Sequence, residues 1–167
     1  VIKMATALCN ILKPIHNDNL IHRDISPNNV MYSQIEDKFY LIDFGNSRLN
    51  KINTPKDTVF AGTPIFMAPE QGGVGTQSDN RTDIYAIGML MKFMLTKNTT
   101  DKKSKIRGRL GKIIKKCTQS EMASRYKNVD KLKFKLSMIK VDDFLFPFKM
   151  YLYILIGVIF ILPTIIT

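Results

Sequence analysis

The stretch Thr82 to Thr96, TDIYAIGMLMKFMLT, is the sequence feature that most constrains the fold. Its apolar residues fall on nearly all sides of a helix, and such a helix is stable only when other elements cover it all round. We therefore expect residues 82–96 to form a buried helix at the centre of a domain. The chain has 167 residues, of which 45% are hydrophobic, which suffices for one ordinary domain.

The elements expected around this central helix are mostly helical. Apolar residues recur at helical spacing in three further segments, 1–16, 109–117 and 129–138. Residues 29–33 and 38–43 have the composition of two short strands, and the polar QIED between them predicts a hairpin. The fold class predicted is mainly α with a small β-hairpin (α+β).

Polar residues gather at the base of this hairpin. Asn29 begins the first expected strand and Asp43 ends the second, so the hairpin would bring them together near Asp24. Carboxylate and amide oxygens suit Mg²⁺, and Asp24 would stay available to accept a proton or orient a hydroxyl. Gly45 would permit the unusual backbone where the strand gives way to the long loop 44–66.

Several motifs follow one another in a fixed order along the chain. HRDISPNN is followed by DFG, by GTPIFMAPE, by DIYAIG and by SRY. Over roughly residues 1–138 these motifs resemble the eukaryotic-type protein kinases, in their Ser/Thr form. The resemblance implies the large C-terminal lobe of the protein kinase fold.

The resemblance also implies the roles of the central residues. Asp24 would be the catalytic aspartate facing the substrate hydroxyl, and Asn29 and Asp43 would hold Mg²⁺ that bridges the phosphates of ATP. Met31 would form part of the floor under the adenine, the alternative being a plain core methionine. The acceptor would be a Ser or Thr hydroxyl of a protein.

Other residues would support this site. Arg23 would meet a phosphate on the activation loop, for which Thr54 and Thr58 are the candidates, although both are equally consistent with ordinary loop hydroxyls. Thr63 would hydrogen-bond near Asp24. His22 would pack beneath the loop.

Three residues would join the supporting segments of the lobe. Glu70 would pair with Arg125, and Asp83 would accept hydrogen bonds from the backbone of the catalytic loop. All three roles are implied by the resemblance.

The sequence departs from the family pattern in the small lobe and at Ser26. It contains no Gly-rich phosphate loop, no lysine strand and no partner glutamate, so the small lobe is missing. We expect residues 1–167 alone to bind ATP poorly, as a fragment of a longer kinase or a decayed reading frame. Ser26 replaces a lysine that contacts the transferred phosphate in the family, and its hydroxyl would be a weaker catalytic donor.

The positive charge of the chain lies in one segment. The net charge is +11, and residues 97–140 hold fifteen Lys or Arg against three Asp or Glu. This segment forms either a solvated helical surface or a contact for anionic lipid; nucleic acid is disfavoured because few aromatic residues accompany the charges. The two cysteines, Cys9 and Cys117, fit no metal site or disulfide framework and favour a reducing compartment.

The C-terminal segment differs in kind from the rest. Residues 150–167 carry no charge over eighteen residues, just enough to span a bilayer, and residues 139–149 would link them to the lobe. Lys149 precedes the segment, which predicts a single-pass membrane protein with a cytoplasmic kinase domain. The alternatives are a buried core helix and a truncated end.

Two function classes follow from the sequence. The first is a membrane-anchored Ser/Thr protein kinase that uses ATP and Mg²⁺. The second is a pseudokinase or interaction module without phosphotransfer, which the retention of Asp24, Asn29 and Asp43 disfavours. A small-molecule phosphotransferase is disfavoured by GTPIFMAPE, which in the family shapes a site for peptides.

Overall fold

The computed structural model describes residues 1–49, 62–72, 77–97 and 106–139. The chain divides into two units, Val1–Leu136 and Ser137–Thr167, and nearly all described residues belong to the first. Its helices are α1 (Ile2–Asn17), α2 (Asn80–Thr96) and α3 (Gly108–Cys117), and residues 129–139 are also helical. Two short 3₁₀ turns, Pro69–Gly72 and Met122–Ser124, complete the helical part. The predicted mainly helical class is confirmed.

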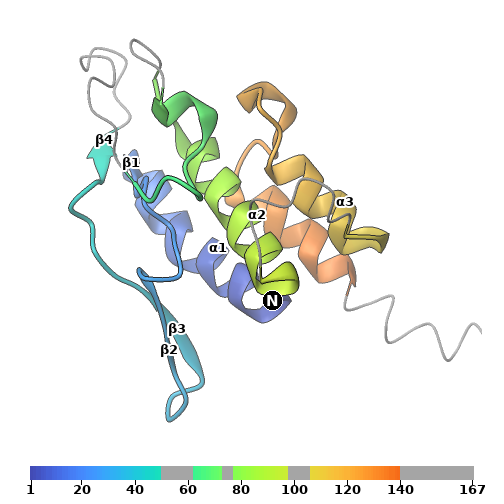
Figure 1. Cartoon of the computed structure of the whole chain (residues 1–167). Helices are drawn as coiled ribbons and strands as arrows, with labels where there is room; N and C mark the ends of the chain where they lie inside the picture. Colours follow the sequence, from blue (N-terminus) through green and yellow to red (C-terminus); the bar gives the residue numbers. More distant parts are fainter. Residues whose placement is uncertain (50–61, 73–76, 98–105, 140–167) are drawn as a thin grey trace, which may run out of the picture. The chain divides into compact units, whose positions relative to one another are not determined.

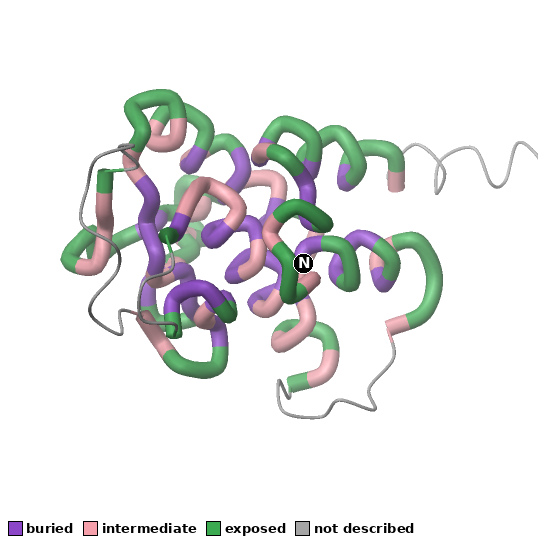
Figure 2. The backbone as a smooth tube through the Cα atoms, turned by 90° about the horizontal axis from the view of Figure 1, so that it is seen from above, coloured by how far each residue is buried: buried purple, intermediate pink, exposed green. Residues whose placement is uncertain are grey.

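Helix α2 lies between α1 and α3 and packs against both (Figure 1). Leu8 and Leu12 of α1 and Ile84 and Ile87 of α2 are fully buried. Figure 2 shows buried residues gathered where the helices face one another and exposed residues along the outer turns. The expectation of a buried central helix is confirmed, except that its last turn exposes Leu95 to 43%.

A single glycine permits the contact between α2 and α3. A Cβ placed at Gly88 would lie 2.5 Å from the Cβ of Cys117 and 2.9 Å from Cγ2 of Thr118. Real Cβ atoms do not approach so closely, and the backbones can meet only because Gly88 has no side chain. Burial at this contact raises the pKa of the Cys117 thiol above its ordinary value, as burial does for Cys9, to about 12. Both cysteines are therefore packing residues with inert thiols.

The sheets are small and antiparallel. Strands β2 (Val30–Ser33) and β3 (Lys38–Leu41) pair with Val30 opposite Leu41, which confirms the predicted hairpin. The loop predicted for residues 44–66 contains a strand that the sequence did not indicate, β4 (Arg48–Leu49), which pairs with β1 (Leu20–Ile21). Two-residue strands carry no periodicity, so only the tertiary pairing reveals them.

The described residues contain no helix long and apolar enough to cross a membrane. The predicted span, residues 150–167, and its linker from residue 140 lie outside the described residues, as do Thr54 and Thr58. Those predictions therefore stay predictions.

Candidate active site

The HRD loop is attached to the central helix through one buried carboxylate. Asp83 of α2 is fully buried, and its Oδ2 accepts a hydrogen bond from the backbone amide of His22 at 3.0 Å. Its Oδ1 accepts one from the amide of Arg23 at 2.9 Å. The ring of His16, at the end of α1, reaches Oδ2 at 2.8 Å. Both carboxylate oxygens thus have partners, and the loop is fixed to α2. The contact of His16 was not predicted from the sequence.

Arg23 has a left-handed backbone, with φ of 68°. Such a conformation is costly for a residue with a Cβ and persists only where its surroundings hold it. The carboxylate of Asp83 accepts a hydrogen bond from the backbone amide of Arg23. The Nε2 of Gln71 donates one to the carbonyl of Arg23 at 2.7 Å. Gly62 lies so close that an added Cβ would stand 2.8 Å from the same carbonyl. The loops on both sides therefore stabilise the strained residue.

His22 lies beneath the loop, fully buried. Its Nδ1 accepts from the amide of Asp24 at 3.3 Å, and its Nε2 is 3.3 Å from the carbonyl of Ile42. These two contacts require a neutral ring that carries its proton on Nε2. The ring also meets Phe44 edge-on, with centroids 4.7 Å apart. His22 thus joins the HRD loop to the DFG segment and does not face solvent.

The carboxylate of Asp24 is half-buried and has donors on both oxygens. Oδ1 accepts from the amide of Thr63 at 2.8 Å and from its hydroxyl at 2.9 Å. Oδ2 accepts from the side-chain amide of Asn46 at 3.2 Å. These contacts fix the direction of the carboxylate. Asn46 was not predicted from the sequence, because nothing in local spacing indicates that a residue after DFG turns back toward the HRD loop.

The hairpin brings Asn29 and the DFG segment together. The amide of Ile42 donates to the carbonyl of Asn29 at 2.9 Å. The side-chain nitrogen of Asn29 donates to the carbonyl of Asp24 at 2.8 Å, which leaves its Oδ1 as the atom free to bind a ligand. Asp43 follows Ile42 directly and its side chain is exposed. The sequence-predicted trio of Asp24, Asn29 and Asp43 thus lies on two adjoining segments.

Asp43, and not Gly45, adopts the unusual backbone at the end of the hairpin. Its φ is 61°, a region that Asp enters more readily than most residues. The amide of Gly45 donates to its Oδ1 at 3.0 Å, and a Cβ on Gly45 would stand 3.0 Å from the same oxygen. The expectation about Gly45 was therefore wrong in its reason. Gly45 leaves room for the Asp43 carboxylate to turn back on the chain.

The donor set at this site suits a hard cation. Asn29 offers an amide oxygen and Asp43 a carboxylate, both of the chemistry that Mg²⁺ prefers, and Mg²⁺ takes its other ligands from phosphates and water. Among the described residues, no three His, Cys, Asp or Glu side chains are grouped so as to hold a metal by themselves. A metal bound here would therefore depend on the ligand as well as on the protein, as a phosphate-bound Mg²⁺ does.

Two predicted site residues differ in burial: Ser26 is buried, whereas Met31 is exposed. Ser26 is fully buried, and its hydroxyl has no hydrogen-bond partner among the described residues. This burial argues against the predicted contact between its hydroxyl and a phosphate or substrate. Met31 is 56% exposed, which argues against the alternative of a plain core methionine. Its strand places it on the same hairpin as the DFG segment.

Two arginines, Arg23 and Arg48, lie close to the β1–β4 pair. The pairing of β1 with β4 sets Arg48 opposite Ile21, two residues before Arg23. Burial, and next the charge of Arg48, lower the pKa of Arg23 from its ordinary value. Two guanidinium groups near each other favour an anion between them. Arg48 was not predicted from the sequence, because only the β1–β4 pairing brings it close to Arg23.

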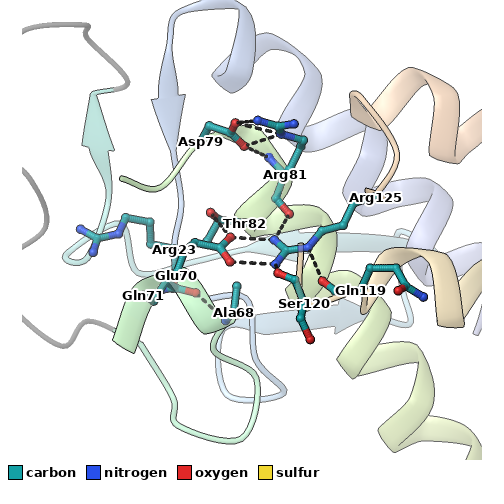
Figure 3. Close-up of polar contacts among 10 residues, drawn as sticks. All are labelled: Arg23, Ala68, Glu70, Gln71, Asp79, Arg81, Thr82, Gln119, Ser120 and Arg125. Atoms are coloured by element: carbon teal, nitrogen blue, oxygen red, sulfur yellow. Dashed lines mark hydrogen bonds and ion pairs between the residues drawn. The ribbon is translucent and has the colours of Figure 1, made fainter. Parts of the chain in front are cut away.

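A buried ion pair joins the APE segment to SRY (Figure 3). Arg125 binds Glu70 through two parallel contacts, Nη1 to Oε1 at 2.6 Å and Nη2 to Oε2 at 2.7 Å. The hydroxyl of Thr82 also donates to Glu70, at 2.8 Å. Glu70 and Arg125, predicted to pair, are thus in bidentate contact, and Thr82 links the pair to α2.

Every N–H of the Arg125 guanidinium has an acceptor. Besides the two bonds to Glu70, it donates to three backbone carbonyls, those of Gln119, Arg81 and Ser120 (Figure 3). A guanidinium has five N–H groups, so none is left unsatisfied. The guanidinium carbon also lies 4.8 Å from the ring centroid of Tyr85. Such full pairing offsets the cost of burying the charge.

Comparison with known proteins agrees with this geometry. The family model described as "Protein kinase domain" matches residues 1–144. The chain belongs to the protein kinase family. It is similar to a protein of Acanthamoeba polyphaga mimivirus that is named as a serine/threonine-protein kinase, with 34% identity over 140 residues, 81% of this chain and 49% of that protein.

Two further relatives carry the same kind of name. Serine/threonine-protein kinase D of Synechocystis sp. is 33% identical over 147 residues, 75% of this chain and 28% of that protein. A serine/threonine-protein kinase of Saccharomyces cerevisiae is 40% identical over 88 residues, 52% of this chain and 8% of that protein. The chain therefore spans half or less of the length of the curated relatives it matches.

Proposed function

We propose that residues 1–138 are the large lobe of a Ser/Thr protein kinase, which transfers the γ-phosphate of ATP to a protein hydroxyl. The observation that carries this proposal is the placing of Asp24, Asn29 and Asp43 on adjoining segments, with the Asp24 carboxylate held by Thr63. A binding module has no physical need for all three. The names of the relatives support the Ser/Thr type.

Each residue has a distinct task in this proposal. Asp24 orients the acceptor hydroxyl and takes its proton at a carboxylate oxygen. Asn29, through Oδ1, and Asp43, through its carboxylate, would hold Mg²⁺. ATP and Mg²⁺ supply the transferred group and the neutralisation of its charge. Thr63 positions Asp24 and narrows the site around the acceptor.

The apolar surface beside this site fits the lower wall of a nucleotide site. Met31 on β2, Ile42 directly after β3 and Phe44 two residues further along the chain are 56%, 40% and 42% exposed, high values for large apolar side chains. We propose that adenine and a small lobe cover them in the complete kinase. The 167 residues alone would then bind ATP weakly, as the sequence predicts.

Arg23 and Arg48 are proposed to receive a phosphate from the activation loop. A doubly charged phosphate between the two guanidinium groups would offset their mutual repulsion. Thr54 and Thr58 remain the candidate phosphosites. A phosphate there would draw the loop toward the strained Arg23, next to Asp24.

The metal role is tested by Asp43→Ala in the full-length gene product that contains these residues. We expect Mg-ATP-dependent phosphorylation of a Ser/Thr-containing protein acceptor to be lost, because one metal oxygen ligand is removed. Asp18→Asn, which neutralises an exposed carboxylate at the end of α1, serves as the matched control and should leave the rate unchanged. Equal activity of Asp43→Ala and the unsubstituted protein would refute the proposal.

A non-catalytic role is the second candidate, and Ser26 favours it. The position carries neither the lysine usual in the family nor an accessible hydroxyl. If the full-length protein shows no transfer under any Mg²⁺ or Mn²⁺ concentration while binding partners through this lobe, the pseudokinase reading replaces the first.

The C-terminal segment is proposed to anchor the protein. Residues 150–167 are uncharged and long enough for a single span, and the kinase lobe would lie on the cytoplasmic side. Extraction of membranes with alkaline carbonate tests this proposal. The intact protein should stay in the pellet, and its release into the supernatant would contradict a spanning helix.

A further inference from the structure

Helices α2 and α3 enclose a hollow outside the candidate active site. The described residues leave a cavity of about 520 Å³ there. Its lining comes from the end of α2, from the segment that enters α3 and from one face of α3, and none of these residues belongs to the candidate catalytic set. The volume is within the range of small ligand sites, so a few side chains of a partner would fit.

The floor of this hollow is apolar and recessed. Ile106 and Ile114 are among its lining, and Ile114 is only 4% exposed. Gly111 allows the backbone at Ile106 to lie close to α3, because a Cβ at Gly111 would stand only 1.8 Å from the carbonyl oxygen of Ile106. The segment entering α3 therefore lies directly against the helix, and the hollow is bounded by backbone on that side.

The rim of the hollow is cationic. Lys92, Arg107, Lys112 and Lys115 line it, and no acidic residue is among the described lining residues. A second hollow of about 300 Å³ shares Lys112 and Lys115 and adds Lys116. The two hollows together form a basic track along α3. Four of the fifteen Lys and Arg residues of segment 97–140 thus line these hollows.

We propose that the hollow between α2 and α3, called the α2–α3 groove below, is a docking site for an acidic segment of another protein. This segment would carry an apolar side chain between its carboxylates. The carboxylates would meet the lysines of the rim, and the apolar side chain would enter the recess over Ile106 and Ile114. Charge complementarity would steer the partner to the groove, and the recess would select among acidic segments.

The recess favours a peptide over the anionic lipid considered for residues 97–140. A helix that binds a membrane surface projects apolar side chains outward beside its basic residues. Here two apolar residues of α3, Ile113 and Ile114, are buried, with 6% and 4% exposed. Nucleic acid is disfavoured because no aromatic residue is among the described lining residues to stack on a base.

Binding is measured on the full 167-residue chain by fluorescence anisotropy. The probe is a labelled peptide in which one leucine is flanked on each side by three aspartates, and a second peptide has glycine in place of leucine. We expect saturable binding of the leucine peptide, weakened at least tenfold by glycine and weakened further as salt is raised. Equal binding of both peptides, or none of either, would overturn the proposal.

Charge-reversal variants locate the site. Lys112→Glu with Lys115→Glu should weaken binding of the leucine peptide at least tenfold. Lys131→Glu with Lys133→Glu makes the same change in net charge at two exposed positions. This control should alter binding of the leucine peptide less than twofold. An equal loss in both pairs would show general charge attraction and would refute a defined groove.

Two further measurements keep the result interpretable. Circular dichroism shows whether the charge-reversal variant folds. If it does not fold, the milder double variant Lys112→Gln with Lys115→Gln is used in its place. We expect this milder variant to weaken binding of the leucine peptide at least threefold. Dihexanoyl-phosphatidylserine, a soluble anionic lipid, is titrated in parallel. Tighter binding of the lipid than of the peptide, lost in the Lys112 and Lys115 variant, would overturn the peptide assignment. Because the readout is binding, it is independent of whether the protein transfers phosphate.

Discussion

Ser26 shows how strongly its surroundings decide what a residue in the HRD loop can do. Its hydroxyl is enclosed, one residue after the buried Ile25 and three before Asn29. An enclosed hydroxyl without a partner costs free energy, since it has given up its bonds to water. By contrast Asp24, two residues earlier, has donors on both carboxylate oxygens. Positions two residues apart in one loop thus differ in what their side chains can contact.

Ser26→Ala should therefore be nearly silent. We expect the free energy of unfolding to change by less than about 1 kcal/mol, or to rise, because the substitution removes a buried donor that has no acceptor in the described part of the chain. The measurement is urea denaturation of the full chain. In the full-length kinase the rate should stay within about twofold, whereas a hydroxyl that donates to the phosphate would cost roughly tenfold or more.

At the level of elements, α2 organises the described part of the chain. One end of it holds the HRD loop through Asp83, and its middle accepts α3 through Gly88. Its Thr82 also bonds to Glu70 of the APE segment. A helix with so many neighbours has to be apolar on most sides, which is why its sequence lacks a polar face. Displacing α2 would disturb the site and the α2–α3 groove together.

Gly88→Ala should separate α2 from α3. The new Cβ would overlap Cys117 and Thr118, and such overpacking costs about 1–3 kcal/mol. The better helix propensity of alanine returns at most about 1 kcal/mol. We therefore expect the free energy of unfolding, measured by urea denaturation, to fall by about 1–2 kcal/mol. Met94→Ala, at an exposed position of the same helix, should change it by less than about 0.5 kcal/mol; a stability gain in Gly88→Ala would contradict the packing argument.

At the scale of the whole lobe, one ion pair connects segments that are far apart in the sequence. Glu70 and Arg125 stand 55 residues apart, and the pair also binds the backbone at Arg81, Gln119 and Ser120. Four segments therefore meet at one guanidinium. The APE segment, which would face a substrate, is in this way held by residues near the end of the lobe.

A double-mutant cycle on this pair should show strong coupling. Arg125→Met alone leaves the Glu70 carboxylate buried without its cation, which costs about 3–5 kcal/mol. Glu70→Leu with Arg125→Met should cost clearly less than the sum of the two single changes, because no unpaired charge remains. Arg125→Lys should also destabilise, since an ammonium cannot replace a five-donor fork. The readout is urea denaturation.

Lys127→Met is the control for this cycle, because Lys127 is exposed near Arg125. It should change the free energy of unfolding by less than about 0.5 kcal/mol. Additive effects of the Glu70 and Arg125 substitutions would mean that the pair contributes no coupling.

The sequence by itself determined the mainly helical class, the central helix, the hairpin and the residues Asp24, Asn29, Asp43, Glu70 and Arg125. These signals are local, because apolar periodicity and ordered motifs lie within short windows. The tertiary structure alone decided the pairing of β1 with β4, the contacts of His16 and Asn46, and the burial of Ser26. It also placed the basic residues of α3 around a hollow. Each of these depends on which distant segments meet, and chain packing, not local spacing, sets those meetings.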